Sequence, residues 1–193
     1  LAEAPDSAAD AVIVPVPVAP TTTQGPRDVA AITYGANPEK KGLDRVLEAW
    51  REARHEGEEL VIAGVGGRNE PGVRYAGMLA RDEYRALLRR ARVFVTAPRR
   101  EDYGIAQLEA LADGCRLVTN AAPGPYAALP LARQLDARLV GGDLARALRT
   151  ALDDPLPDYA ERAAELLAPW RPEEVDRVVV EELLPRLLAL EEG

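Results

Sequence analysis

The chain has 193 residues, a length that suits one domain with its own hydrophobic core. Its content of 47% hydrophobic and 29% charged residues excludes a mainly disordered or collagen-like chain. The net charge of −8 argues against a nucleic-acid-binding surface, which needs a basic excess. One cysteine, Cys115, and one histidine, His55, exclude an internal disulfide and a His-rich metal site and favour a reducing, cytoplasmic compartment.

The first 28 residues are rich in proline and contain an apolar run that begins at Ala11. The run is too short to span a bilayer, and no basic region precedes it as in a secretory signal. We predict that residues 1–28 are the end of a missing N-terminal domain followed by an interdomain linker, because the chain opens on Leu1 rather than methionine.

Residues 29–157 alternate between short apolar runs and helical patterns. Six strands are expected at 29–34, 60–63, 73–76, 92–96, 116–119 and 137–140, with helices at 43–56, 81–91, 104–113 and 143–152. This order predicts an α/β fold, a Rossmann-like doubly wound parallel sheet of about six strands flanked by helices. Ligands bind such sheets beyond the carboxyl ends of the strands, so the loops that begin at residues 35, 64, 77, 97 and 120 are expected at one edge.

The remaining residues, 158–193, are expected to form C-terminal helices over 158–168 and 172–192. Pro185 is expected to kink or divide the second helix. Its apolar face (Val175, Val178, Val179, Leu183, Leu184 and Leu187) is expected either to pack on this domain or to cross to the missing one.

Lys40 and Lys41 are adjacent and are the only lysines among 24 basic residues. They follow the first expected strand and precede the helix that begins near Leu43. An ammonium group beside the amino end of a helix favours an anion, so this loop is a candidate phosphate site.

The segment 97–114 holds two glutamates, Glu101 and Glu109, with Gly104 between them. Gly104 allows a close approach of the backbone, and the amides of Gly104, Ile105 and Ala106 are expected to point into the crevice. Because a carboxylate accepts hydrogen bonds from both hydroxyls of a ribose, Glu109 is a candidate sugar ligand.

Two stretches, Pro98-Arg-Arg-Glu-Asp-Tyr-Gly104 and Glu109-Ala-Leu-Ala-Asp-Gly-Cys-Arg-Leu-Val118, resemble the hallmark of the family 4, or group 1, retaining glycosyltransferases. Lys41-Gly42, Leu60-Val-Ile-Ala-Gly-Val-Gly66 and Val73-Arg-Tyr-Ala-Gly77 match the same family in order and spacing. The resemblance implies the GT-B fold, in which two Rossmann-like domains face each other and the C-terminal one binds the sugar nucleotide.

The resemblance also implies roles for single residues. Lys41 would neutralise the nucleotide diphosphate, Glu109 would hold the ribose and Glu101 would contact the transferred sugar. The amides at Gly104, Ile105 and Ala106 would contact phosphate or sugar, and the backbone near Met78 would meet the base. The donor would be a UDP- or GDP-sugar with no cofactor and no catalytic metal, and the acceptor would lie on the missing domain. Peripheral membrane association of the full-length protein is compatible with this family.

The sequence departs from the family pattern at three positions. Ala36 stands where an arginine usually helps to hold the diphosphate, Arg99 replaces a serine, and Asp102 replaces a glycine. Arg99, Arg100 or Arg68 is therefore expected to supply the missing cation.

Two functions remain in view. The first is the donor-binding domain of a retaining glycosyltransferase, which alone would bind a donor without completing the transfer. The second is a non-catalytic Rossmann-like module that binds a nucleotide or a partner. An NAD-type dehydrogenase is disfavoured, because Gly64-Val-Gly-Gly67 lacks the full phosphate-binding fingerprint.

Overall fold

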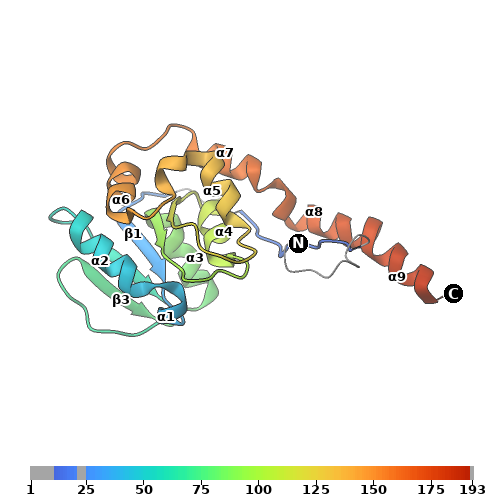
Figure 1. Cartoon of the computed structure of the whole chain (residues 1–193), viewed down its shortest axis with the longest axis horizontal. Coiled ribbons are helices and arrows are strands. Elements are labelled where there is room, and N and C mark those ends of the chain that lie inside the picture. The colour runs from blue at the N-terminus through green and yellow to red at the C-terminus, as the bar shows by residue number, and fades with distance from the viewer. Residues whose placement is uncertain (1–10, 21–24, 192–193) are drawn as a thin grey trace.

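A single parallel sheet forms the centre of the molecule, as the computed structural model shows for residues 11–20 and 25–191 (Figure 1). The sheet has five strands in the order β3-β2-β1-β4-β5, and every pair is parallel. The strands are β1 (Val29–Tyr34), β2 (Leu60–Ala63), β3 (Val73–Gly77), β4 (Ala91–Thr96) and β5 (Arg116–Thr119). The predicted α/β, Rossmann-like parallel sheet is confirmed.

Helices connect the strands and cover the sheet. They are α1 (Pro38–Lys41), α2 (Leu43–Ala53), α3 (Arg81–Arg90), α4 (Ile105–Ala112), α5 (Ala128–Asp136) and α6 (Leu144–Asp153). The central strands are buried along nearly their whole length, which explains why they are almost purely apolar in sequence. Trp50 of α2 is fully buried, and its indole Nε1 donates to the carbonyl of Gly72 at 2.7 Å.

The strand order reverses direction at the centre of the sheet. The chain runs from β1 outward through β2 to β3, and then returns to pair β4 with β1 on its other side. Such a reversal opens a crevice at the carboxyl ends of the strands, where ligands bind. The loops after all five strands lie at this edge, as the sequence predicts.

The expected sixth strand, at residues 137–140, is wrong. This segment forms a 3-10 turn, η2 (Ala137–Leu139), and only Val140 makes a single parallel bridge, to Thr119. The cause is local, because the Asp136 carboxylate accepts hydrogen bonds from the backbone amide and the guanidinium of Arg138. These contacts fix the turn in place of an extended ladder.

The first C-terminal helix packs against the α/β body, and the later ones extend away from it (Figure 1). They are α7 (Tyr159–Leu166), η3 (Ala168–Trp170), α8 (Pro172–Val178), the π-helical segment η4 (Val179–Leu183) and α9 (Leu184–Glu191). Pro185 is the second residue of α9, so the predicted disturbance is the change of helical pitch where η4 ends. Of the predicted apolar face, Val175 is buried, whereas Leu184 and Leu187 are 44% and 49% exposed.

The predicted linker, 1–28, is only partly described, because residues 1–10 and 21–24 lie outside the described residues. Residues 11–20 and 25–28 have no regular secondary structure. The amide of Val18 donates to the carbonyl of Trp170 at 2.7 Å, which joins this segment to the C-terminal helices. Within the described parts of the chain, no helix is long and apolar enough to cross a membrane.

Candidate functional site

A cavity of about 510 Å³ opens at the carboxyl edge of the sheet. It lies between α1, the start of α3, the loop after β4 and the start of α4. Seven candidate site residues from the sequence line this one cavity: Lys40, Lys41, Glu101, Gly104, Ile105, Ala106 and Glu109. The structure therefore brings together residues from two loops that are about 60 positions apart.

The short helix α1 presents the two lysines. Asn37 precedes it in the left-handed conformation (φ 57°), and its side chain accepts a hydrogen bond from the amide of Lys40 at 3.2 Å. Gly42 follows with φ 63°, and a Cβ there would lie 2.0 Å from the carbonyl oxygen of Ala97. Only glycine allows this contact, which holds α1 against the loop after β4. The amide of Arg99 also donates to the carbonyl of Lys40, at 2.9 Å.

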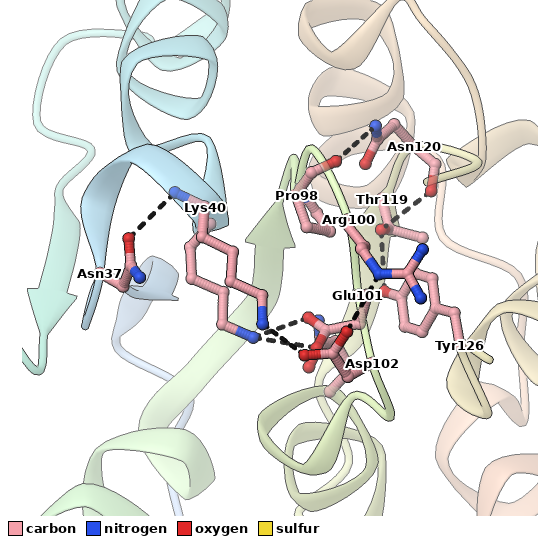
Figure 2. A network of polar contacts seen from close by, with 11 residues as sticks. Asn37, Lys40, Pro98, Arg100, Glu101, Asp102, Thr119, Asn120 and Tyr126 are labelled. Carbon is pink, nitrogen blue, oxygen red and sulfur yellow. Dashed lines mark hydrogen bonds and ion pairs between the residues drawn. The ribbon is translucent and has the colours of Figure 1, made fainter. Parts of the chain in front are cut away.

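Lys41 and Glu101 form an ion pair in the cavity wall. The Lys41 Nζ lies 2.8 and 3.0 Å from the two carboxylate oxygens of Glu101, whose side chain is 4% exposed. Gln107 donates a further hydrogen bond to Glu101, at 2.8 Å. Beside this pair, Lys40 reaches across from α1 to Asp102 (Figure 2). Two ammonium groups and two carboxylates thus meet at one end of the cavity.

The amino end of α4 forms another part of the wall. Gly104 precedes the helix with φ 93°, and a Cβ there would lie 2.8 Å from the ring of Tyr126. The first-turn amides of a helix have no partner within the helix, so those of Ile105 and Ala106 are free for an anionic or polar ligand. The Ile105 side chain is 45% exposed and lines the cavity.

Glu109 lies one turn further along α4 and also lines the cavity. Its Oε1 is 3.8 Å from a guanidinium nitrogen of Arg81 and 3.8 Å from one of Arg85, distances too long for hydrogen bonds. Burial raises the pKa of Glu109 above its ordinary value, while the charges of Arg85 and Arg81 oppose that shift. Arg85 is held in place by Asp113, with contacts of 2.5 and 2.9 Å.

Four other predicted residues do not line the cavity. Arg99 pairs with Asp44 at 2.7 and 3.0 Å, and Arg100 lies 3.3 Å from Asp102. Met78 is 75% exposed beside the cavity residue Leu79. Arg68, the other cation considered, is exposed in the loop after β2 and is absent from the wall.

The sequence did not single out Arg81, Tyr84 and Tyr34, although all three line the cavity. Arg81 and Tyr84 belong to α3, whose pattern shows an ordinary amphipathic helix. The rings of Tyr34 and Tyr84 lie 5.4 Å apart with an interplanar angle of 57°. Their proximity to the α4 residues depends on how α3 packs beside α4, which no local pattern reveals.

A second cavity, of about 400 Å³, lies at the same edge between α2 and α6. Its lining includes Glu48, Glu52 and Asp143 but only one cation, Arg45. This excess of carboxylates disfavours an anion. In the first cavity the three cations Lys40, Lys41 and Arg81 balance its three carboxylates. Among residues 11–20 and 25–191, no group of three or more His, Cys, Asp or Glu side chains is placed to hold a metal ion.

Comparison with known families decides the class of protein. The family model described as "Glycosyl transferases group 1" matches residues 28–158, more than half of the chain. The chain belongs to the group 1 glycosyltransferases. The predicted resemblance is thereby confirmed, and the cavity is the candidate functional site of a GT-B glycosyltransferase domain.

Solved glycosyltransferase structures share this fold. The pneumococcal O-GlcNAc transferase GtfA, solved with UDP and GlcNAc, superimposes with a TM-score of 0.66 at 18% identity, over 88% of this chain and 38% of its own. WaaG, a glycosyltransferase of lipopolysaccharide biosynthesis, gives 0.59 at 19% identity, over 80% of this chain and 47% of its own. The UDP-forming trehalose-phosphate synthase of Burkholderia xenovorans gives 0.62 at 21% identity, over 82% and 44%.

At these identities the comparison shows the fold alone. The chain spans less than half the length of each of these three enzymes. No curated protein sequence matches the chain.

Proposed function

We propose that this chain is the donor-binding domain of a retaining glycosyltransferase that uses a nucleoside diphosphate sugar. The observation that carries the proposal is the cavity itself, which gathers Lys41, Glu101, the amino end of α4 and Glu109. These groups supply a cation, free amides and a sugar-binding carboxylate in one space of about 510 Å³. A nucleoside diphosphate sugar needs these groups, because its diphosphate binds cations and amides and its sugar hydroxyls bind a carboxylate.

The diphosphate would bind between α1 and the amino end of α4. Lys41 would contribute its ammonium, and Ile105 and Ala106 would contribute backbone amides. Departure of the diphosphate builds up negative charge, so fixed donors there stabilise the transition state more than the ground state. Arg81 lines the same cavity and is 74% exposed, so it is free to add the positive charge that Ala36 does not provide.

The ion pair between Lys41 and Glu101 suits the reacting end of the donor. Glu101 holds the Lys41 ammonium at 2.8 Å, which fixes its position before a phosphate arrives. The same carboxylate would lie beside the transferred sugar, where its charge favours an oxocarbenium-like transition state. Gln107 fixes the orientation of that carboxylate through its 2.8 Å hydrogen bond.

Transfer to an acceptor would need a second domain. The chain covers 38% to 47% of the three enzymes compared above, and the acceptor would lie on the part that is not in this chain. We therefore expect the domain alone to bind the donor without transferring its sugar. The exposed apolar residues of η4 and α9 would face that second domain.

The proposal is tested by isothermal titration calorimetry with UDP, GDP and ADP. We expect one of them to bind, and Lys41→Ala to weaken its binding by about 10- to 100-fold, since a hydrogen bond to a charged group contributes about 1.5–3 kcal/mol. Glu109→Ala should weaken binding by about tenfold or more for the same reason.

Two surface variants serve as controls. Arg146→Ala removes an exposed cation of α6, and Glu165→Ala removes an exposed carboxylate of α7, both remote from the cavity lining. Each should bind the nucleotide as the unmodified chain does. Equal affinity of Lys41→Ala, Glu109→Ala and the controls would contradict the assignment of the cavity.

A further inference from the structure

Tyr84 is a buried residue in the cavity wall whose hydroxyl has no partner. The residue is 8% exposed, and its hydroxyl oxygen forms no hydrogen bond with any described residue. An unpaired buried hydroxyl lowers the stability of a protein, so a phenylalanine would suit this position better in the ligand-free state. The hydroxyl therefore needs an explanation other than packing.

The Glu109 carboxylate, a hydrogen-bond acceptor, likewise lacks a close partner. Its carboxylate lines the same cavity and is 14% exposed, yet its contacts within the described structure are the two ion pairs at 3.8 Å. Tyr84 and Glu109 line the same cavity, and burial, followed by the Glu109 charge, raises the pKa of Tyr84 well above its ordinary value. No hydrogen bond joins these two described side chains. A donor and an acceptor thus lie close together in one cavity without satisfying each other.

We propose that Tyr84 is a specificity-determining residue that binds a ribose hydroxyl of the donor together with Glu109, an inference that rests on the proposed function. A ligand hydroxyl can donate its hydrogen to the Glu109 carboxylate and accept a hydrogen bond from the Tyr84 hydroxyl at the same time. A phosphate oxygen cannot take this place, because it has no hydrogen to donate and the carboxylate repels it. The geometry therefore favours the sugar of the nucleoside.

Access to the Tyr84 hydroxyl needs a small adjustment, since that atom is enclosed in the ligand-free protein. Arg81 lines the same cavity with a side chain that is 74% exposed, so we expect this side chain to move when a ligand enters. The Tyr34 ring, 5.4 Å away, keeps the Tyr84 ring in place meanwhile. The Tyr84 ring thus stays packed against Tyr34 while the exposed Arg81 side chain moves.

The test uses Tyr84→Phe, which keeps the ring and removes only the hydroxyl. We expect its melting temperature to rise by about 2–4 °C, because an unsatisfied buried group is lost. We expect its affinity for the best binder among UDP, GDP and ADP to fall about five- to tenfold, as for the loss of one hydrogen bond. Tyr75→Phe, a tyrosine outside the cavity, should bind like the unmodified chain.

Deoxy analogues of that nucleotide identify the group that Tyr84 contacts. In the unmodified chain, the 2′-deoxy or the 3′-deoxy nucleoside diphosphate should bind several-fold more weakly, and in Tyr84→Phe that penalty should be smaller. Unchanged affinity of Tyr84→Phe, or unchanged penalties for both analogues, would overturn the inference and leave the proposed function standing if Lys41→Ala still loses binding. Absence of nucleotide binding in the unmodified chain would overturn both.

Discussion

Lys41 and Glu101 face each other across the cavity wall with side-chain exposures of 21% and 4%. Removal of one member of a buried pair leaves a charge without its partner, at a cost of about 3–5 kcal/mol. Lys41→Met should therefore lower the free energy of unfolding by about 3 kcal/mol. This value is at the low end of the range because Lys41 keeps some contact with solvent. Urea denaturation measures this value.

The double variant Lys41→Met, Glu101→Gln separates stability from binding. The amide that replaces the Glu101 carboxylate would be neutral and could still bond Gln107, so most of the lost stability should return while nucleotide binding stays weak. A double variant no more stable than Lys41→Met would show that the pair is not what holds these loops together.

Glu109 gives the stability of the ligand-free chain a dependence on pH. Its pKa is raised in the folded state, chiefly by burial, so the folded state binds the proton more tightly than the unfolded state does. The stability that this proton contributes is present at low pH and is lost as the pH rises through the Glu109 pKa. Glu109→Gln should thus be more stable than the unmodified chain at pH 7, and the difference should vanish in acid.

Urea denaturation between pH 4 and pH 7.5 tests this expectation, with Glu165→Gln on the exposed face of α7 as the control. A Glu109→Gln protein that is less stable at pH 7 would show that Arg81 and Arg85 outweigh the cost of burial.

At the residue scale, Lys41, Glu101 and Glu109 could be predicted because their spacing in the chain carries the motif. Tyr84 and Arg81 could not, because they enter the cavity through the packing of α3 beside α4. Arg99 is the opposite case, a residue that the sequence suggests but that does not line the cavity. Its sequence neighbours suggest a ligand, but its guanidinium pairs with Asp44, which is 55 positions away.

At the scale of elements, Gly42 determines where α1 places its two lysines. Gly42→Ala should lower the free energy of unfolding by about 2–4 kcal/mol, because the new Cβ would combine left-handed strain with a clash against the Ala97 carbonyl. Gly57 offers a matched control, since it has φ 82° but no atom within 4 Å of a Cβ. Gly57→Ala should cost only about 1 kcal/mol. If urea denaturation gave the same loss of unfolding free energy for both variants, the contact between α1 and the loop after β4 would not stabilise the fold.

The strands β1, β2, β4 and β5 were predictable because each is a short, largely apolar and largely buried run, whereas the edge strand β3 contains Arg74 and is half-buried after Val73. Residues 137–140 show the same apolar character, but the Asp136 carboxylate bonds the Arg138 amide at 3.0 Å and closes a turn. Helix α5, at Ala128–Asp136, had no clear signal, because Pro123, Gly124 and Pro125 precede it. Its place depends on tertiary contacts such as the amide of Ala127 with the carbonyl of Tyr103, at 2.9 Å.

At the scale of the molecule, the C-terminal extension contributes little to the folded body. Val180, Leu184, Leu187 and Leu188 are between 44% and 62% exposed. A chain that ends at Val178 should therefore keep its melting temperature within about 2 °C, and should associate less at high concentration in sedimentation velocity. A chain that ends at Pro157 would lose the buried Tyr159, Ala163 and Leu167 and should unfold. A large fall in melting temperature for the first truncation would show that η4 and α9 belong to the core.

At the same scale, the net charge of −8 is compatible with a site that binds an anion. The molecule repels polyanions in general, while Lys40, Lys41 and Arg81 gather at one cavity. The anion site is therefore local, and its binding should be more selective than that of a basic surface.

Backbone amide chemical shifts during a titration with the best-binding nucleoside diphosphate test the central claim most directly. The largest changes should fall on Lys41, Gly104, Ile105 and Ala106, with smaller ones at Met78 and Leu79. Changes centred on Asn120, Gly142 and Asp143 would place the nucleotide in the second cavity. Either that result, or a spectrum that the nucleotide leaves unchanged, would contradict a donor site at the amino end of α4.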